Sequence, residues 1–157
     1  MERIRECSRI GLALTVMLMG ASICFARGLE LKIKGTKATV YDSSIKKWIE
    51  LPSYRSWQKG MASSDLALVM SERCVWIYDS SIGKWIELPV YKRWREGFVS
   101  SNLAMIMSKH YVRVYDSSIK KWIELPSYKR WREGFLSSNL AMVVGERYVW
   151  VYDSSIK

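Results

Sequence analysis

The chain has 157 residues, of which 49% are hydrophobic and 25% are charged. This balance excludes an intrinsically disordered chain, and the length suffices for one domain with its own core. The formal net charge is +10. Such an excess of cations predicts affinity for polyanions, whether nucleic acid, acidic polysaccharide or an anionic membrane surface, without choosing among them.

Residues 1–26 have the pattern of a secretory signal peptide. Arg3, Arg5 and Arg9 precede the uncharged stretch 10–26, and Cys24 and Ala26 are small enough for the −3 and −1 positions of a cleavage site. An uncleaved membrane anchor formed by residues 10–26 is the alternative, although this stretch is short for a hydrocarbon core of about 30 Å. We therefore expect export to the periplasm or the cell exterior.

Cleavage after residue 26 would remove three Arg and two Glu, so the mature chain would carry a charge of +9. Cys74 would then be the only cysteine, which rules out a disulfide within the mature chain. We expect Cys74 to be a core thiol, with a bridge between two chains as the alternative.

Residues 27–157 repeat with a period of 37, and a fixed period must be considered before any local motif. Identical residues recur in register, and each column combines one residue from every copy: Leu29, Leu66, Leu103 and Leu140; Asp42, Asp79, Asp116 and Asp153; Trp48, Trp85 and Trp122; Pro52, Pro89 and Pro126; Tyr54, Tyr91 and Tyr128; Trp57, Trp94 and Trp131; Gly60, Gly97 and Gly134. We draw the units at residues 29–65, 66–102 and 103–139, with a partial unit at 140–157. Residue types that recur in this way serve the architecture.

Each unit has the pattern of short β-strands. In the third copy, residues 103–107 are apolar on both faces, 111–115 alternate, and 121–125 end at a proline, while 131–136 make a weaker fourth strand. The Asp-Ser-Ser segments between strands are typical of turns, because their side chains hydrogen-bond nearby backbone. Strands that are apolar on both faces need cover on both faces. The sequence therefore predicts an all-β protein.

The segment at residues 40–52, repeated at 114–126 and closely at 77–89, resembles the kelch repeat. It shares the Tyr-Asp pair, the short polar turn, the Trp seven residues after the Tyr and the Leu-Pro end. It lacks the kelch glycine doublet, and its 37-residue period is shorter than the kelch period of about 50. The resemblance implies a kelch-like β-propeller array of antiparallel blades, each of three or four strands.

The number of units predicts an incomplete array of about three and a half blades. Two chains that associate as a homodimer could complete the propeller, or the sequence could be a fragment of a longer protein. A β-trefoil and a small four-bladed propeller are the alternatives. In the first unit, Leu29, Leu31 and Ile33 alternate with charged residues, and this gives the polar face expected of a capping repeat.

The sequence offers little catalytic chemistry. His110 is the only histidine and falls in a turn, and no cluster of residues has the spacing of a metal site or a catalytic triad. The Asp column and the glutamates Glu50, Glu87 and Glu124 are better explained by turn capping and by pairing with neighbouring cations. We therefore expect no enzymatic activity, no cofactor and no metal.

The segment after each proline combines cations with aromatic residues, which suits anionic or sugar ligands. The candidate ligand-binding residues are Tyr54, Arg55, Trp57, Tyr91, Lys92, Arg93, Trp94, Arg95, Tyr128, Lys129, Arg130, Trp131 and Arg132. If the tryptophans instead pack between blades, their periodicity has a structural cause.

The sequence favours an exported, non-enzymatic scaffold that binds a protein or an anionic glycan through this basic, aromatic rim, while export disfavours nucleic acid. The alternatives are a fragment of a larger propeller enzyme, whose missing blades carry the active site, and a recently amplified repeat protein without a defined ligand site.

Overall fold

The computed structural model describes residues 28–156 except for residues 54, 72–73, 90–93 and 126–129. Over this part of the chain it contains fourteen strands in four antiparallel sheets, which we call blades 1 to 4. No helix in these ranges is long and apolar enough to cross a membrane. The all-β prediction is confirmed.

Strands that follow one another along the chain are neighbours within each blade. Blade 1 contains β1 (Leu29–Lys34), β2 (Lys37–Asp42) and β3 (Lys47–Glu50). Blade 2 contains β4 (Lys59–Ala62), β5 (Leu66–Met70), β6 (Cys74–Asp79) and β7 (Lys84–Pro89). Blade 3 contains β8 (Glu96–Val99), β9 (Leu103–Met107), β10 (Val112–Asp116) and β11 (Lys121–Glu124). Blade 4 contains β12 (Trp131–Leu136), β13 (Leu140–Gly145) and β14 (Val149–Asp153).

The blades are offset from the sequence units. The predicted fourth strand of the third unit is present as β12, but it pairs with β13 of the next unit and not with β11. The same holds for β4 with β5 and for β8 with β9. Strand β3 ends two residues before Pro52, and β7 ends at Pro89. Because proline has no N–H to continue the ladder, the chain leaves the sheet at these positions and starts the next blade.

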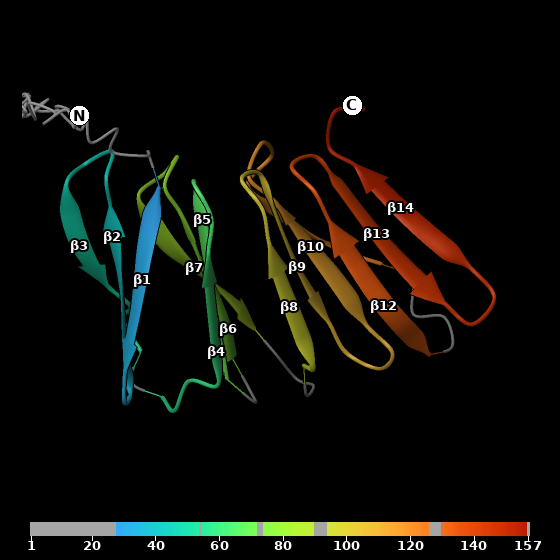
Figure 1. Cartoon of the computed structure of the whole chain (residues 1–157), viewed down its shortest axis with the longest axis horizontal. Coiled ribbons are helices and arrows are strands. Elements are labelled where there is room, and N and C mark those ends of the chain that lie inside the picture. Colours follow the sequence, from blue (N-terminus) through green and yellow to red (C-terminus); the bar gives the residue numbers. More distant parts are fainter. Residues whose placement is uncertain (1–27, 54, 72–73, 90–93, 126–129, 157) are drawn as a thin grey trace, which may run out of the picture.

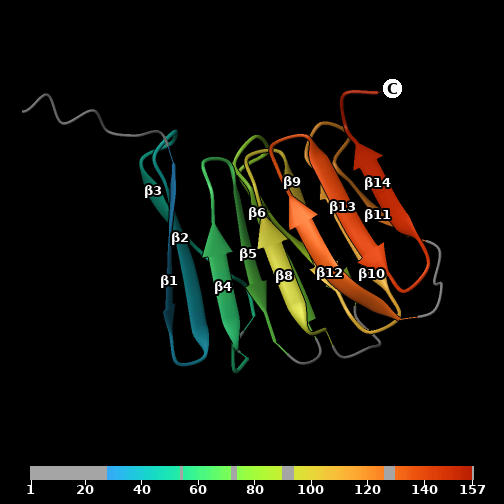
Figure 2. The ribbon, with the colours of Figure 1, turned by 45° about the vertical axis from the view of Figure 1, so that its right-hand side comes forward.

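The four blades stand face to face in an open row, with blade 1 at one end and blade 4 at the other (Figures 1 and 2). All residues of β5 and β9 are buried, because blades 2 and 3 are covered on both faces. Strands β1 and β14 at the ends are largely exposed. The array is therefore not a β-trefoil: it has four blades, the last with three strands, in an open row.

Each gap between blades contains its own apolar core. Between blades 1 and 2, Val40 packs with Ala67 and Tyr78. Between blades 3 and 4, residues of β9 and β10 pack with Ala141 and Val143 of β13. Burial of apolar surface between blades is therefore the main force that holds the array together. Cys74, at the start of β6, is buried and has a free thiol, as we expected.

The glycine column allows the first strand of each blade to approach the preceding blade. A Cβ atom at Gly60 would lie 2.5 Å from Cδ1 of Ile33 and 2.7 Å from Cδ2 of Leu31. At Gly134, two blade pairs further along, it would lie 2.7 Å from Cε of Met105. The glycines recur because the stacking distance recurs.

Candidate binding surface and the joints between blades

The structure describes seven of the thirteen candidate ligand-binding residues: Arg55, Trp57, Trp94, Arg95, Arg130, Trp131 and Arg132. The other six lie outside the described residues: Tyr54, Tyr91, Lys92, Arg93, Tyr128 and Lys129.

The three described tryptophans of this set pack between blades. Trp131 is only 4% exposed and belongs to the core between blades 3 and 4. Trp94 packs against the core between blades 2 and 3, and Trp57 packs against the one between blades 1 and 2. Trp57 also donates its indole N–H to the carbonyl of Thr36 at 3.1 Å. The strict periodicity of these tryptophans therefore has a packing cause.

Cations of the same set gather in a hollow beside blades 3 and 4. The hollow has a volume of about 520 Å³ and is lined by Arg95, Lys109, Arg130, Trp131, Arg132 and Glu146. Four of these side chains are cationic and one is acidic. Arg132 and Glu146 form an exposed ion pair at 3.6 Å. Among the described residues, the other three cations have no acidic partner within ion-pair distance. The hollow is therefore electropositive.

A β-bulge contributes to the shape of this hollow. Strand β12 pairs Trp131 with Gly145 and Glu133 with Val144, so Arg132 is the extra residue between them. A bulge redirects the side chains around it, and bulges often occur beside functional sites. Here it lets Trp131 point into the core while Arg132 remains largely exposed and can reach Glu146.

The repeated aspartates form polar joints between blades. In each turn, one carboxylate oxygen accepts the backbone N–H of the Ser two residues later, at 2.9 Å for Asp42, 2.9 Å for Asp79, 2.8 Å for Asp116 and 2.9 Å for Asp153. This confirms the predicted turn capping. The second oxygen of the first three accepts a tyrosine hydroxyl from the next blade.

The three tyrosine hydroxyls in these joints come from equivalent positions. Tyr78 donates to Asp42 at 2.8 Å, Tyr115 to Asp79 at 2.8 Å and Tyr152 to Asp116 at 2.6 Å. Asp42, Asp79 and Asp116 are at most 1% exposed. A buried carboxylate without such donors would be costly. The hydrogen bonds of the joints therefore define how neighbouring blades are aligned, which apolar packing alone does less strictly.

These contacts shift the titration of both partners. Burial opposes ionisation of Asp42 and Asp116, but hydrogen bonds from serine and tyrosine outweigh it and lower the pKa of both carboxyls below the ordinary value. Burial, the hydrogen bond to Asp116 and that negative charge together raise the pKa of Tyr152 to about 12. The pKa values of Tyr78 and Tyr115 are also raised, first by burial and then by their aspartate partners. At neutral pH the joints at Asp42 and Asp116 thus each place a neutral phenol against a carboxylate.

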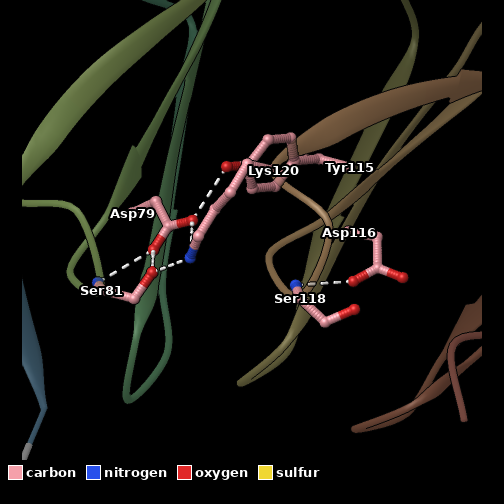
Figure 3. Close-up of polar contacts among 6 residues, drawn as sticks. All are labelled: Asp79, Ser81, Tyr115, Asp116, Ser118 and Lys120. Atoms are coloured by element: carbon pink, nitrogen blue, oxygen red, sulfur yellow. Dashed lines mark hydrogen bonds and ion pairs between the residues drawn. The ribbon is translucent and has the colours of Figure 1, made fainter.

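The joint between blades 2 and 3 has an additional cation (Figure 3). The ammonium of Lys120 lies 3.4 Å from the carboxylate of Asp79 and also contacts the hydroxyl of Ser81. Lys120 has a φ of 57°, in the left-handed region, at the position that Gly83 occupies in the previous blade with a φ of 63°. The turn therefore requires a residue in the left-handed conformation. In this copy a lysine adopts it, although it is less favourable than for glycine, and its side chain reaches the neighbouring blade.

Two of the three repeated glutamates pair with neighbouring cations, as expected. Glu124 pairs with Arg113 at 2.6 Å, and Glu50 pairs with Lys37 at 3.3 Å. His110 is exposed in the loop between β9 and β10, as predicted. Within the described ranges, no three His, Cys, Asp or Glu side chains are placed to hold a metal ion.

Sequence reasoning identified the aspartate column but missed the tyrosines that reach it from the next blade. The signal was present, because each of the first three aspartates is followed 36 residues later by a Tyr. A shared period shows that two columns are both architectural. It does not show that a residue of one copy meets a residue of the next.

Comparisons with known proteins support the fold. No protein-family model matches the chain, and no curated protein matches it by sequence. Among solved structures, Hsv2 of Kluyveromyces marxianus is 13% identical with a TM-score of 0.50, over 80% of this chain and 44% of that one. The N-terminal domain of Nup159 is 14% identical with a TM-score of 0.47, over 73% of this chain and 35% of that one.

The tricorn protease is 15% identical with a TM-score of 0.48, over 83% of this chain and 16% of that one. The chain thus spans less than half the length of each of these structures. At such identities the likeness concerns architecture only. Together with the four stacked antiparallel sheets, the match to Hsv2 shows that this chain is an incomplete β-propeller-like array of three- and four-stranded blades.

Proposed function

We propose that this chain is a non-enzymatic scaffold that binds a macromolecular partner through the electropositive hollow beside blades 3 and 4. The observation that carries the proposal is the convergence of Arg95, Lys109, Arg130 and Arg132 on one hollow with a single acidic side chain. The partner would be a protein or a glycan that presents carboxylate or sulfate groups.

The chemistry of the hollow favours an anionic ligand. Arginine guanidinium groups present planar pairs of N–H donors that match carboxylate and sulfate oxygens. Because Trp131 is buried, the hollow offers charge and hydrogen bonds more than an open aromatic platform. The binding surface that we propose is therefore narrower than the aromatic rim suggested by the sequence, and it depends on arginine and lysine.

Two finer proposals accompany this function. We propose that residues 1–26 direct export. N-terminal sequencing of the protein secreted by a host cell tests this: a mature chain that begins near Arg27 supports export, and one that begins at Met1 contradicts cleavage.

We propose that the units are kelch-like because of the shared Tyr-Asp, Trp and Leu-Pro pattern. The homodimer expected from the number of units is a competing hypothesis, and light scattering of the native chain tests it.

The binding proposal is tested by removing the charge of the hollow. We expect the triple variant Arg95→Ser, Arg130→Ser and Arg132→Ser to elute from a heparin column at clearly lower salt than the native chain. Each arginine that binds a sulfate group releases counterions from the polyanion, so fewer arginines make binding weaker and less dependent on salt. All three side chains are exposed, so the fold should persist.

The matched control removes the same charge at the other end of the blades. Lys47, Lys84 and Lys121 are exposed and start the strands that follow the aspartate turns. If the control variant Lys47→Ser, Lys84→Ser and Lys121→Ser elutes as early as the arginine variant, binding reflects net charge alone and the proposed surface is wrong. Titration with polyglutamate in place of heparin shows whether protein carboxylates are preferred to glycan sulfates.

A further inference from the structure

The outer face of blade 4 is apolar and exposed, although its equivalents elsewhere are buried. Leu140 is 39% exposed, whereas Leu103, in the same column of blade 3, is 0% exposed. The columns of β14 behave likewise: Val149 and Val151 are 60% and 51% exposed, and both of their counterparts in blade 3 are fully buried. In blade 3 these columns form the surface on which blade 4 packs. Blade 4 therefore presents half of an interface between blades.

The polar half of that interface is also open. One oxygen of Asp153 accepts the N–H and the hydroxyl of Ser155, at 2.9 and 2.6 Å, as in the other turns. At Asp42, Asp79 and Asp116 the second oxygen accepts a tyrosine from the following blade. Within the part of the chain that the structure describes, the second oxygen of Asp153 accepts no hydrogen bond.

The opposite end of the array does not offer a matching surface. At the position of Glu30 in blade 1, the other three blades have a buried Ala, and at the position of Lys32 they have a buried Val or Ile. In blades 2, 3 and 4 these residues face the preceding blade. Glu30 and Lys32 form an exposed ion pair at 3.0 Å, and the Lys32 ammonium lies 4.2 Å above the Trp48 ring. Burial of this pair against the valines of blade 4 would remove two charges from water with no new partner. Blade 1 is therefore capped.

We propose that the outer face of blade 4 is a docking surface for one further blade of the same kind. This blade would have Ala and Val or Ile at the positions equivalent to Glu30 and Lys32, and it would present a tyrosine to Asp153. The three existing joints define this partner, because each combines the same apolar columns with the same tyrosine-to-aspartate hydrogen bond. The charged pair of blade 1 prevents a second native copy from being that partner. This inference does not depend on the electropositive hollow.

The full-length chain itself can be converted into the probe. The double variant Glu30→Ala and Lys32→Val gives blade 1 the surface of blades 2 to 4, and Tyr41 is already present at the tyrosine position. A third substitution, Val151→Lys, blocks the outer face of blade 4 in the same chain. We expect this donor chain to form a 1:1 complex with the native chain in light scattering and sedimentation, while the native chain alone stays monomeric.

Two controls identify the joint. Addition of Val151→Lys to the native partner should abolish the complex. Tyr41→Phe in the donor chain, which keeps the ring and removes the hydroxyl, should weaken the complex by about tenfold, since a hydrogen bond to a carboxylate is lost. Asp153→Asn in the partner should weaken it too, and the two changes together should cost less than the product of their separate effects.

The remaining outcomes overturn the proposal. If donor and native chains form no complex, the face does not accept a blade. If a complex forms but neither Tyr41→Phe nor Asp153→Asn weakens it, the contact is non-specific apolar association. If the native chain dimerises alone and Val151→Lys abolishes that dimer, the charged pair of blade 1 does not exclude a second copy.

Discussion

The joint between blades 2 and 3 gives the sharpest prediction, the substitution Tyr115→Phe. The ring of Tyr115 is fully buried, and its hydroxyl donates to Asp79 at 2.8 Å. Phenylalanine fills the same space, so the change removes one hydrogen bond to a buried carboxylate and little packing. Hydrogen bonds to charged groups contribute about 1.5–3 kcal/mol, and the Lys120 ammonium at 3.4 Å partly compensates for the loss. We expect the free energy of unfolding to fall by about 1.5–2.5 kcal/mol.

Urea unfolding followed by circular dichroism measures this change. The matched control is Tyr41→Phe, because Tyr41 occupies the same column in blade 1 and its hydroxyl makes no hydrogen bond among the described residues. We expect that control to change stability by less than about 0.5 kcal/mol. A double-mutant cycle with Asp79→Asn isolates the coupling between the two side chains. If Tyr115→Phe costs no more than Tyr41→Phe, or if the cycle shows no coupling, the joint does not stabilise the array.

Three further predictions concern the same architecture. Leu103→Ala should lower the free energy of unfolding by urea by about 2–5 kcal/mol, because the side chain is fully buried. Leu140→Ala, in the same column but exposed, should lower it by less than about 1 kcal/mol. Equal losses would show that blade 4 is covered in solution. Lys46→Gly should raise stability by about 0.5–1 kcal/mol, because Lys46 has a φ of 55°, and a fall in stability would show that its side chain is needed. The lowered pKa of Asp42 and Asp116 stabilises the fold at pH values above the ordinary 3.8, and this contribution is lost as the pH falls below that value. The raised pKa of Tyr152 contributes stability below pH 10, and this contribution is lost as the pH rises towards 12, so stability measured against pH should decline at both limits. Tyr152→Phe should reduce the alkaline decline, and it should also reduce the acid decline, because the Tyr152 hydroxyl helps to lower the pKa of Asp116.

The fold was largely predictable because its signals are local and repeated. The alternation of apolar residues predicted the strands, and even the weak pattern at residues 131–136 corresponds to β12. The continuous apolar run at residues 103–107 predicted cover on both faces, which blades 2 and 4 supply. What failed was the assignment of strands to sheets, since a period of 37 has no intrinsic starting point.

The candidate site was less predictable, because periodicity does not separate packing from binding. Trp94 and Trp131 repeat as strictly as the arginines beside them, yet they pack between blades. Lys109 and Glu146 line the hollow from loops that follow other strands, so their approach to Arg132 depends on the stacking of blades 3 and 4. Neither loop has a sequence pattern that would mark it as part of a site.

The repeated joint gives the array a direction. Every blade offers an aspartate to the blade that follows and a tyrosine to the blade that precedes, so blades can be stacked in only one order. At the first blade this series is ended by Glu30 and Lys32, which replace the apolar contacts with charges. At the fourth blade no such replacement occurs, and the aspartate, leucine and valines keep the identities they have inside the array. Because stability in stacked repeats is nearly a sum over units and neighbouring interfaces, each further blade docked there adds about one more interface to the free energy of unfolding. The two ends of this array therefore differ in their surfaces: the outer face of blade 1 carries a charged pair, whereas the outer face of blade 4 keeps the apolar residues and the aspartate that contact the next blade elsewhere in the array.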